Sequence, residues 1–172
     1  ALTKKNGEKE PPCEMVPELQ ETGSEILVKC GGVLYRFSRR ESCLMGAEYE
    51  GQTMLTGGPH LHMNGIDLPR WKSTRAAYAA LEGRRAVVIL QGRYGDLIHV
   101  QFILRISGDG KMNAEYQLRE ISLNADQLSE MGLSFEIPGD AMQVQWEREG
   151  LYSVYPENHI GRNRGLADRI FP

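Results

Sequence analysis

The feature that most constrains the fold of this chain is a series of short runs in which apolar and polar residues alternate. In residues 25–30, for example, Ile26 and Val28 would face one side of a strand, and Leu27 and Lys29 would face the other. Side chains alternate between the two faces of a strand, so this pattern predicts strands. The Gly-Gly pair that follows is a typical turn sequence.

The same pattern recurs along the chain, with turn sequences between the runs. It predicts strands at residues 33–38, 43–49, 52–55, 85–92, 97–106, 111–121, 131–137 and 142–148. Residues 56–59 read as a turn, and residues 107–110 read as the turn of a hairpin. Two segments are less clear: the alanines of 73–81 favour a helix by propensity, and 123–130 is expected to contain a short helical turn.

Many short strands separated by turns are typical of an antiparallel β-sandwich. The chain has no G-x-G-x-x-G motif before a helix and no phosphate-binding P-loop, which argues against a nucleotide-binding α/β fold. Residues 1–22 are polar and contain three prolines, so we expect a flexible arm or linker there. The sandwich domain is expected to occupy residues 23–172.

The composition of the chain argues against some classes of function. The chain has 172 residues, a net charge of -3 and an isoelectric point near 5.9. We therefore expect no nucleic-acid partner, because dedicated nucleic-acid binders usually carry a basic stripe. No apolar run approaches the roughly 20 residues that cross a bilayer, and no signal peptide is visible, so no membrane partner is expected. The first residue is Ala, which indicates a fragment or a processed product.

The three cysteines, Cys13, Cys30 and Cys43, do not form a regular disulfide framework. No C-x-x-C pair suitable for zinc is present. We expect buried free thiols, while a bridge between Cys30 and Cys43 stays open at this point.

Three motifs follow one another within residues 131–162. Residues 132–138 have the form G-x-x-F-x-x-P, residues 146–150 have the form W-x-x-x-G, and Tyr155-Pro156 follows. This order and spacing resemble the C-terminal β-sandwich module of family 2 glycoside hydrolases of the β-galactosidase type.

The start of the same module is also matched. Residues 32–38, Leu44, residues 51–55 and Pro59 resemble its strand ending in F-x-F-S, its following Leu and its G-x-x-L-L … G-P run. The resemblance covers about residues 25–165 of the chain and part of the module.

The chain departs from the family after Pro59. The best-known members continue with an N-F-W-R-A-x-x-D-N-D segment that reaches toward the active site, whereas residues 59–65 here read P-H-L-H-M-N-G. The residues that this segment contributes to the active site in the family therefore have no matching residues in this chain. In the P-H-E-N-Y-P-D-R motif of the family, only Tyr155, Pro156 and the acidic Glu157 match.

The resemblance implies an all-β fold: a partial antiparallel supersandwich of the galactose-mutarotase-like type, in which residues 73–81 form a strand. It also implies a function. Glycoside hydrolysis needs two carboxylates beside the scissile bond, and the family supplies both from a catalytic barrel that this chain lacks. We therefore expect a non-catalytic module that packs on the barrel of a parent enzyme and borders its sugar pocket. No catalytic residue and no cofactor is expected.

Aromatic side chains stack on the apolar faces of sugars, and polar neighbours bind the hydroxyl groups. The candidates for sugar binding are Trp71, Trp146, Tyr152, Tyr155, Glu157, Asn158, His159 and Arg162. A strand Trp is also a typical core residue of a sandwich, so Trp146 has a structural alternative. Trp71 has the same two interpretations, sugar binding or a place in the core. The two tyrosines could instead anchor their loop.

His60 and His62 are two residues apart, which places both on one face of a strand. Such a pair can chelate a metal, but the sequence shows no third ligand, so these are weak candidates. Two other functions stay open: an independent carbohydrate-binding module, and a structural domain whose open sheet edge pairs with a second copy. The family makes a periplasmic or secreted parent enzyme plausible, although no signal in the chain indicates the compartment.

Overall fold

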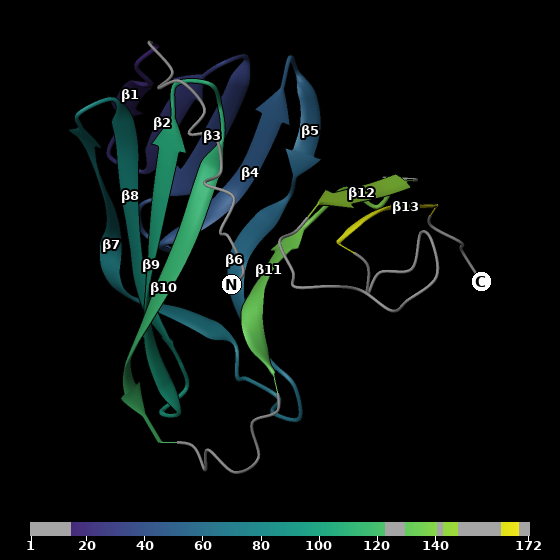
Figure 1. The fold of residues 1–172 in the computed structure, drawn as a ribbon. Coiled ribbons are helices and arrows are strands. Elements are labelled where there is room, and N and C mark those ends of the chain that lie inside the picture. The colour runs from purple at the N-terminus through teal and green to yellow at the C-terminus, as the bar shows by residue number, and fades with distance from the viewer. Residues whose placement is uncertain (1–14, 123–129, 141–142, 148–162, 169–172) are drawn as a thin grey trace, which may run out of the picture. The chain divides into compact units, whose positions relative to one another are not determined.

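The fold is described from a computed structural model, which describes residues 15–122, 130–140, 143–147 and 163–168 (Figure 1). The chain divides into two compact units, Ala1–Glu136 and Ile137–Pro172. Each unit is described by itself.

The first unit contains two antiparallel sheets (Figure 1). One sheet has seven strands in the order β1-β2-β3-β4-β6-β11, with β5 also paired to β4. Its strands are β1 (Glu18–Glu21), β2 (Glu25–Cys30), β3 (Val33–Ser38), β4 (Cys43–Tyr49), β5 (Gln52–Leu55), β6 (Gly57–Met63) and β11 (Met131–Glu136). The other has four strands in the order β10-β9-β8-β7. These are β7 (Trp71–Glu82), β8 (Arg85–Tyr94), β9 (Ile98–Ser107) and β10 (Met112–Ile121).

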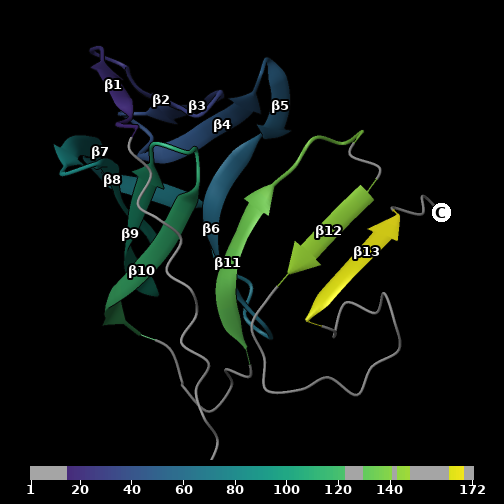
Figure 2. The same ribbon diagram turned by 45° about the horizontal axis from the view of Figure 1, so that its top comes forward.

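The two sheets pack face to face around one hydrophobic core, as the tilted view in Figure 2 shows. The first sheet contributes the buried side chains of Ile26, Val28 and Phe37, which alternate with more exposed neighbours. The second sheet contributes alternate residues of β8 and β9, among them Leu90 and Phe102. The chain is therefore an all-β antiparallel sandwich, as the alternating pattern predicts. The finer assignment to a galactose-mutarotase-like supersandwich stays a prediction.

The tight turns have the backbone geometry that their sequences predict. Gly31 and Gly32, between β2 and β3, have φ angles of 53° and 79°. A two-residue type I′ hairpin turn needs positive φ at both central positions, which glycine adopts without strain. The hairpin predicted at residues 107–110 is also present, since the Ser107 amide bonds to the Lys111 carbonyl and joins β9 to β10. Both turns confirm the prediction from sequence.

Most predicted strands are confirmed to within two residues. The alanine-rich segment 73–81 lies inside β7, because Ala77 and Ala79 fit the closely packed inner face of the sandwich. The turn predicted at 56–59 is wrong: β6 begins at Gly57, and its first residues are buried against β11. The helical turn expected at 123–130 lies almost wholly outside the described residues.

The end of the segment expected to be an N-terminal arm forms a strand. β1 pairs with β2 in a four-residue register that runs from Glu18 opposite Lys29 to Glu21 opposite Ile26. Leu19, in the middle of β1, packs against the hydrophobic core. The sheet thus starts earlier than expected, because one apolar side chain and four backbone pairings suffice to order a short edge strand.

The second unit contains a two-stranded antiparallel sheet of β12 (Gln143–Glu147) and β13 (Arg164–Asp168). An ion pair of 2.6 Å joins Arg164 to Glu147 at one end. Within the described part of the chain, no helix is long and apolar enough to span a membrane.

Candidate functional site: a polar groove beside β6

The main groove of the first unit begins where two neighbouring strands separate. β4 and β6 pair at a single position, Leu44 opposite Gly58, and β6 then pairs with β11 on its other side. Beyond Gly58, the edge of β6 that faces β4 therefore lacks a partner among the described strands. An unpaired strand edge exposes backbone hydrogen-bonding groups, which need other partners.

Tyr94 of β8 supplies one such partner from the opposite sheet. The Leu61 amide of β6 donates a hydrogen bond of 2.9 Å to the Tyr94 hydroxyl oxygen. Tyr94 is buried, and this burial raises the pKa of its hydroxyl group. A tyrosine from one sheet thus bonds to a backbone amide of a strand in the other sheet, and it lines the groove.

Trp71, at the start of β7, packs beside Tyr94 within the sandwich. Its ring centroid lies 5.3 Å from that of Tyr94 and 5.5 Å from that of Phe102, in tilted arrangements typical of aromatic pairs. A Cβ atom at Gly92 would collide with the Trp71 ring, so the absence of a side chain there makes room for the indole. The indole N–H donates to the Glu41 carbonyl at 3.0 Å.

The turn between β3 and β4 is fixed to the opposite sheet by two serines. The Ser73 hydroxyl donates to the Arg40 carbonyl at 2.8 Å, and the Gln91 amide donates to the buried Ser42 hydroxyl at 2.9 Å. These bonds place the side chains of Arg40 and Glu41 at the rim of the groove.

A histidine–glutamate pair also lines the groove. His60 Nε2 is 3.1 Å from Glu136 Oε1, and both side chains remain accessible to water. Cys43 also lines the groove. Burial raises the pKa of the Cys43 thiol, and the charges of Glu41 and Glu136 raise it further. A raised pKa disfavours the thiolate, which is the reactive form of cysteine.

Residues 64–70, which connect β6 in one sheet to β7 in the other, form the end of the groove. The resulting space has a volume of about 1290 Å³. Its wall and rim residues include Arg40, Glu41, Cys43, His60, His62, Asn64, Asp67, Arg70, Trp71, Lys72, Tyr94 and Glu136.

This set of side chains suits recognition of a neutral, hydroxyl-rich ligand. It offers donors from arginine and lysine, acceptors from carboxylates, and an aromatic residue in the wall. The groove also contains the carboxylates of Glu41, Asp67 and Glu136, and hydrolysis of a glycoside needs two carboxylates that flank the scissile bond.

The structure brings three of the sequence candidates together: Trp71, His60 and His62 all line this groove. The two histidines share the outer face of β6, as predicted, because they alternate with buried Leu61 and Met63. Among the described residues, no group of three or more His, Cys, Asp or Glu side chains could hold a metal. The histidine pair thus gains no third ligand from the described part of the chain.

The other candidates lie in the second unit. Trp146 is half-buried in β12, opposite Gly165 of β13, and its indole occupies the space that a side chain at that glycine would need. The remaining candidates, Tyr152, Tyr155, Glu157, Asn158, His159 and Arg162, lie outside the described residues.

Sequence reasoning missed Glu136, Tyr94, Arg40 and Glu41 as groove residues. Glu136 meets His60 only because β11 pairs with β6 across 76 residues of sequence. No local signal predicts that register. Cys30 and Cys43 both remain thiols, so the bridge that the sequence left open is not formed.

Comparisons with known proteins add no relative. The chain matches no protein-family model, and a search of curated proteins found no match.

Proposed function

We propose that this chain is a non-catalytic β-sandwich module of a family 2 glycoside hydrolase. In this role it packs on the catalytic barrel of the parent enzyme and borders the sugar pocket. The proposal rests on the motif order along the chain, on the sandwich fold, and on the groove beside β6. The resemblance implies a galactoside-type substrate for the parent enzyme.

One observation carries the proposal furthest. Residues 60–71 follow the Gly58-Pro59 dipeptide, and in the resemblance they correspond by sequence order to the family segment that reaches toward the active site. In this structure most of them line the polar groove, with His60 on one wall and Trp71 on another. The segment has a different sequence from the family's, and its polar and aromatic side chains are of the kinds that bind sugars.

A sugar titration of the isolated chain tests the proposal. Galactose, lactose and a galacto-oligosaccharide would be added to ¹⁵N-labelled protein, and the indole N–H signals of Trp71 and Trp146 would be followed. A Trp146→Phe variant assigns the two signals. Because the barrel half of the pocket is absent, we expect weak, saturable shifts at Trp71, with dissociation constants in the millimolar range.

A matched pair of histidine variants locates the binding. His60→Ala removes a groove residue that pairs with a glutamate, and His99→Ala removes a histidine of β9 that pairs with Glu120 at 3.6 Å outside the groove. We expect only His60→Ala to abolish the Trp71 shifts.

The other outcomes separate the alternatives. Micromolar affinity in isolation would favour an independent carbohydrate-binding module. A folded protein whose spectrum does not change with any of the sugars would refute the sugar-bordering role. The interpretation as a structural domain would then remain. Sedimentation velocity on the same sample would then show whether an open sheet edge pairs with a second copy.

A further inference from the structure

The outer face of the four-stranded sheet has a charge opposite to that of the whole chain. Residues facing away from the core are recognised because they alternate with the buried residues of β8 and β9 and pair across the strands in register. The cationic residues of this face are Lys72, Arg75, Arg85, Arg93, Arg105 and Arg119, and the acidic ones are Glu82, Glu115 and Glu120.

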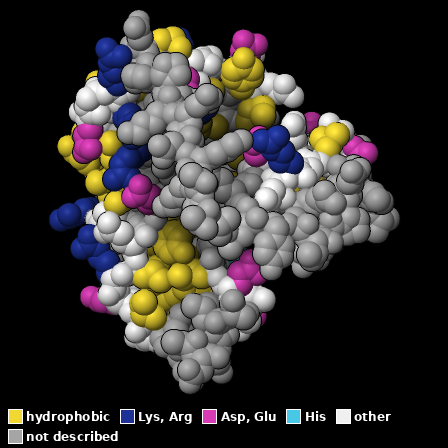
Figure 3. All heavy atoms as spheres, in the orientation of Figure 1, with side chains coloured by type: hydrophobic (Ala, Val, Ile, Leu, Met, Phe, Trp, Pro, Cys, Tyr) yellow, Lys and Arg dark blue, Asp and Glu magenta, His cyan; other side chains and the backbone are white. Residues whose placement is uncertain are grey.

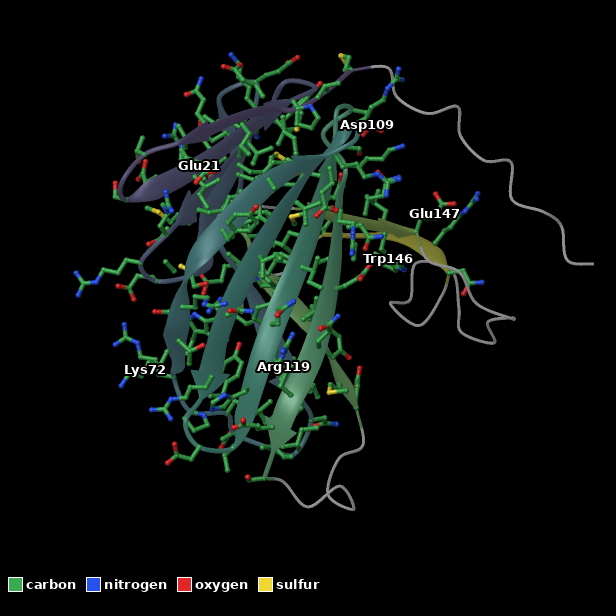
Figure 4. The ribbon with its side chains drawn as sticks, turned by 90° about the vertical axis from the view of Figure 1, so that its left-hand side faces the viewer. Glu21, Lys72, Asp109, Arg119, Trp146 and Glu147 are labelled. Carbon is green, nitrogen blue, oxygen red and sulfur yellow. The ribbon has the colours of Figure 1, made fainter. Side chains whose placement is uncertain are left out.

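The chain as a whole contains 20 Lys and Arg against 23 Asp and Glu residues. Positive charge is therefore concentrated on this face. Figure 3 shows dark-blue Lys and Arg side chains along the left-hand side of the molecule, over these strands. Figure 4 looks at that side, with Arg119 over the middle of the sheet and Lys72 projecting from its edge.

A small pocket lies at one end of this face, near the β9–β10 hairpin. Its volume is about 150 Å³, and its wall contains three cationic side chains and two neutral polar ones. The pocket residues are Arg85, Arg105, Ser107, Lys111, Met112 and Asn113. Among the residues that the structure describes, no carboxylate is part of this wall.

Arg105 is held in place by a carboxylate on the neighbouring strand. Its Nη1 atom lies 2.6 Å from Glu115 Oε1, and the side chain is 30% exposed. A guanidinium group has five N–H donors, and one carboxylate engages only part of them. Arg105 is thus oriented by Glu115 and still has donors to offer.

The hairpin on the other side of the pocket is also ordered by hydrogen bonds. Ser107 donates to Asp109, which lowers the pKa of that carboxyl group, and the Lys111 amide donates to the same carboxylate. Lys111 Nζ lies 3.3 Å from Asp109 Oδ2. The hairpin therefore presents Lys111 from a defined backbone.

Arg85 distinguishes the pocket from an ordinary set of ion pairs. It is exposed at the start of β8 and makes no ion pair with any residue of the described ranges. Arg85 pairs with Ser107 of β9. Arg105 of β9 pairs with Val87, which is two residues after Arg85 in β8 and faces the same side of the sheet. Glu115 and Asp109 offset the charges of Arg105 and Lys111, and Glu82 lies opposite Arg85 in β7 without forming an ion pair. An anion in the pocket would therefore be stabilised chiefly by Arg85 and by the remaining N–H donors of Arg105.

We propose that this pocket binds a small oxyanion, namely a sulfate or carboxylate group. Arg85 and Arg105 donate charge-assisted hydrogen bonds to it, and the side-chain amide of Asn113 supplies a neutral donor. The same group could come from a free anion or from an acidic saccharide. The proposal stands apart from the module function and from the groove beside β6, which lies among other residues.

The test uses the full chain and two neighbouring arginines. Arg85→Ala removes a cation from the pocket, and Arg84→Ala removes the same charge from the exposed turn one residue earlier, outside the pocket wall. Arg85→Lys keeps the charge and loses the planar donor group. Dispersed ¹⁵N–¹H spectra would show that each variant is folded.

Three probes would be titrated at low ionic strength: inorganic sulfate, a sulfated disaccharide and its unsulfated counterpart. We expect saturable shifts of the Lys111, Met112 and Asn113 amides with the first two probes and none with the third. Arg85→Ala should weaken binding about tenfold and Arg84→Ala less than twofold, with Arg85→Lys in between.

The source of the anion follows from the same titrations. Tighter binding of the sulfated disaccharide than of inorganic sulfate assigns the pocket to an acidic saccharide, and equal binding assigns it to a free anion. Equal losses in Arg84→Ala and Arg85→Ala would show diffuse attraction to a basic face and would overturn the proposal. The absence of shifts at the pocket amides with every probe would also overturn it.

Discussion

At the scale of single residues, the Tyr94 hydroxyl replaces a strand partner. Tyr94→Phe removes the acceptor of the Leu61 amide and leaves a buried N–H group unpaired. We expect a loss of about 1–3 kcal/mol in the free energy of unfolding, measured by urea denaturation. The control is Tyr78→Phe, because Tyr78 is 58% exposed, and it should change stability by less than about 0.5 kcal/mol. Equal effects of the two changes would contradict this role of Tyr94.

Tyr35 predicts how stability depends on alkaline pH. Its hydroxyl donates to the Gly110 carbonyl at 2.7 Å. Burial, with the nearby Cys30 and Asp109 charges, raises its pKa from 10.0 to about 12. The unfolded chain therefore loses this proton at lower pH than the folded chain. The stability due to the neutral tyrosine is fully present below pH 10 and is lost as the pH rises toward 12.

The measurement is the free energy of unfolding of the wild type and of Tyr35→Phe as the pH is raised through this range. Between pH 10.0 and about pH 12, the free energy of unfolding should fall more in the wild type than in the variant. Parallel curves for the two proteins would show that Tyr35 does not contribute to the alkaline transition.

At the scale of elements, the β2–β3 turn lies against the β9–β10 hairpin. A Cβ atom at Gly31 would lie 2.6 Å from the Asp109 backbone, and the φ angle of Gly31 is 53°. Gly51, in the β4–β5 turn, also has a positive φ, of 83°, but a Cβ atom there would have no neighbouring atom within 4 Å. A substitution at Gly51 therefore tests backbone strain alone, whereas a substitution at Gly31 adds steric overlap with the neighbouring hairpin.

We expect Gly51→Ala to cost about 1–2 kcal/mol, which is the usual penalty for a left-handed conformation. Gly31→Ala should cost about 2 kcal/mol more, because one hairpin must also move away from the other. Thermal or urea unfolding measures both. Similar losses in the two variants would show that the hairpins adjust without strain.

At the scale of the whole molecule, the division at Glu136 predicts which truncations the sandwich tolerates. A chain ending after residue 136 keeps both sheets of the first unit. It should unfold cooperatively, with a stability within about 1 kcal/mol of the full chain. A chain ending after residue 129 loses β11, and with it Leu133 and Phe135, which pack against the core.

We expect this shorter chain to lose about 3 kcal/mol or more, because its apolar core becomes exposed along β6. Urea unfolding followed by circular dichroism compares the three chains. Equal stability of the two truncated chains would show that β11 is dispensable to the sandwich. A large loss on ending at residue 136 would show that the second unit supports the first.

Much of this architecture could be predicted from local sequence. Apolar residues at every second position of β2 and β3, such as Ile26 and Val28, predicted the bounds of both strands correctly, and the Gly31-Gly32 pair marked the turn between them. β6 was not among the predicted strands, because Gly57, Gly58 and Pro59 usually mark turns. Here they form a strand whose burial against β11 outweighs the local preference, and a side chain at Gly58 would collide with Phe135.

The sequence by itself determined the fold class, the number and place of most strands, and the position of His60 and His62 on one face. These features follow from side-chain alternation and turn chemistry, which act between near neighbours. Only the tertiary structure decided that β4 and β6 separate after Leu44 and Gly58, and that Glu136 lies beside His60. It also decided that Arg85 and Arg105 share a pocket with Lys111. These contacts depend on strand order and register, which are set by burial of the whole core. No short stretch of sequence contains a pattern that predicts them.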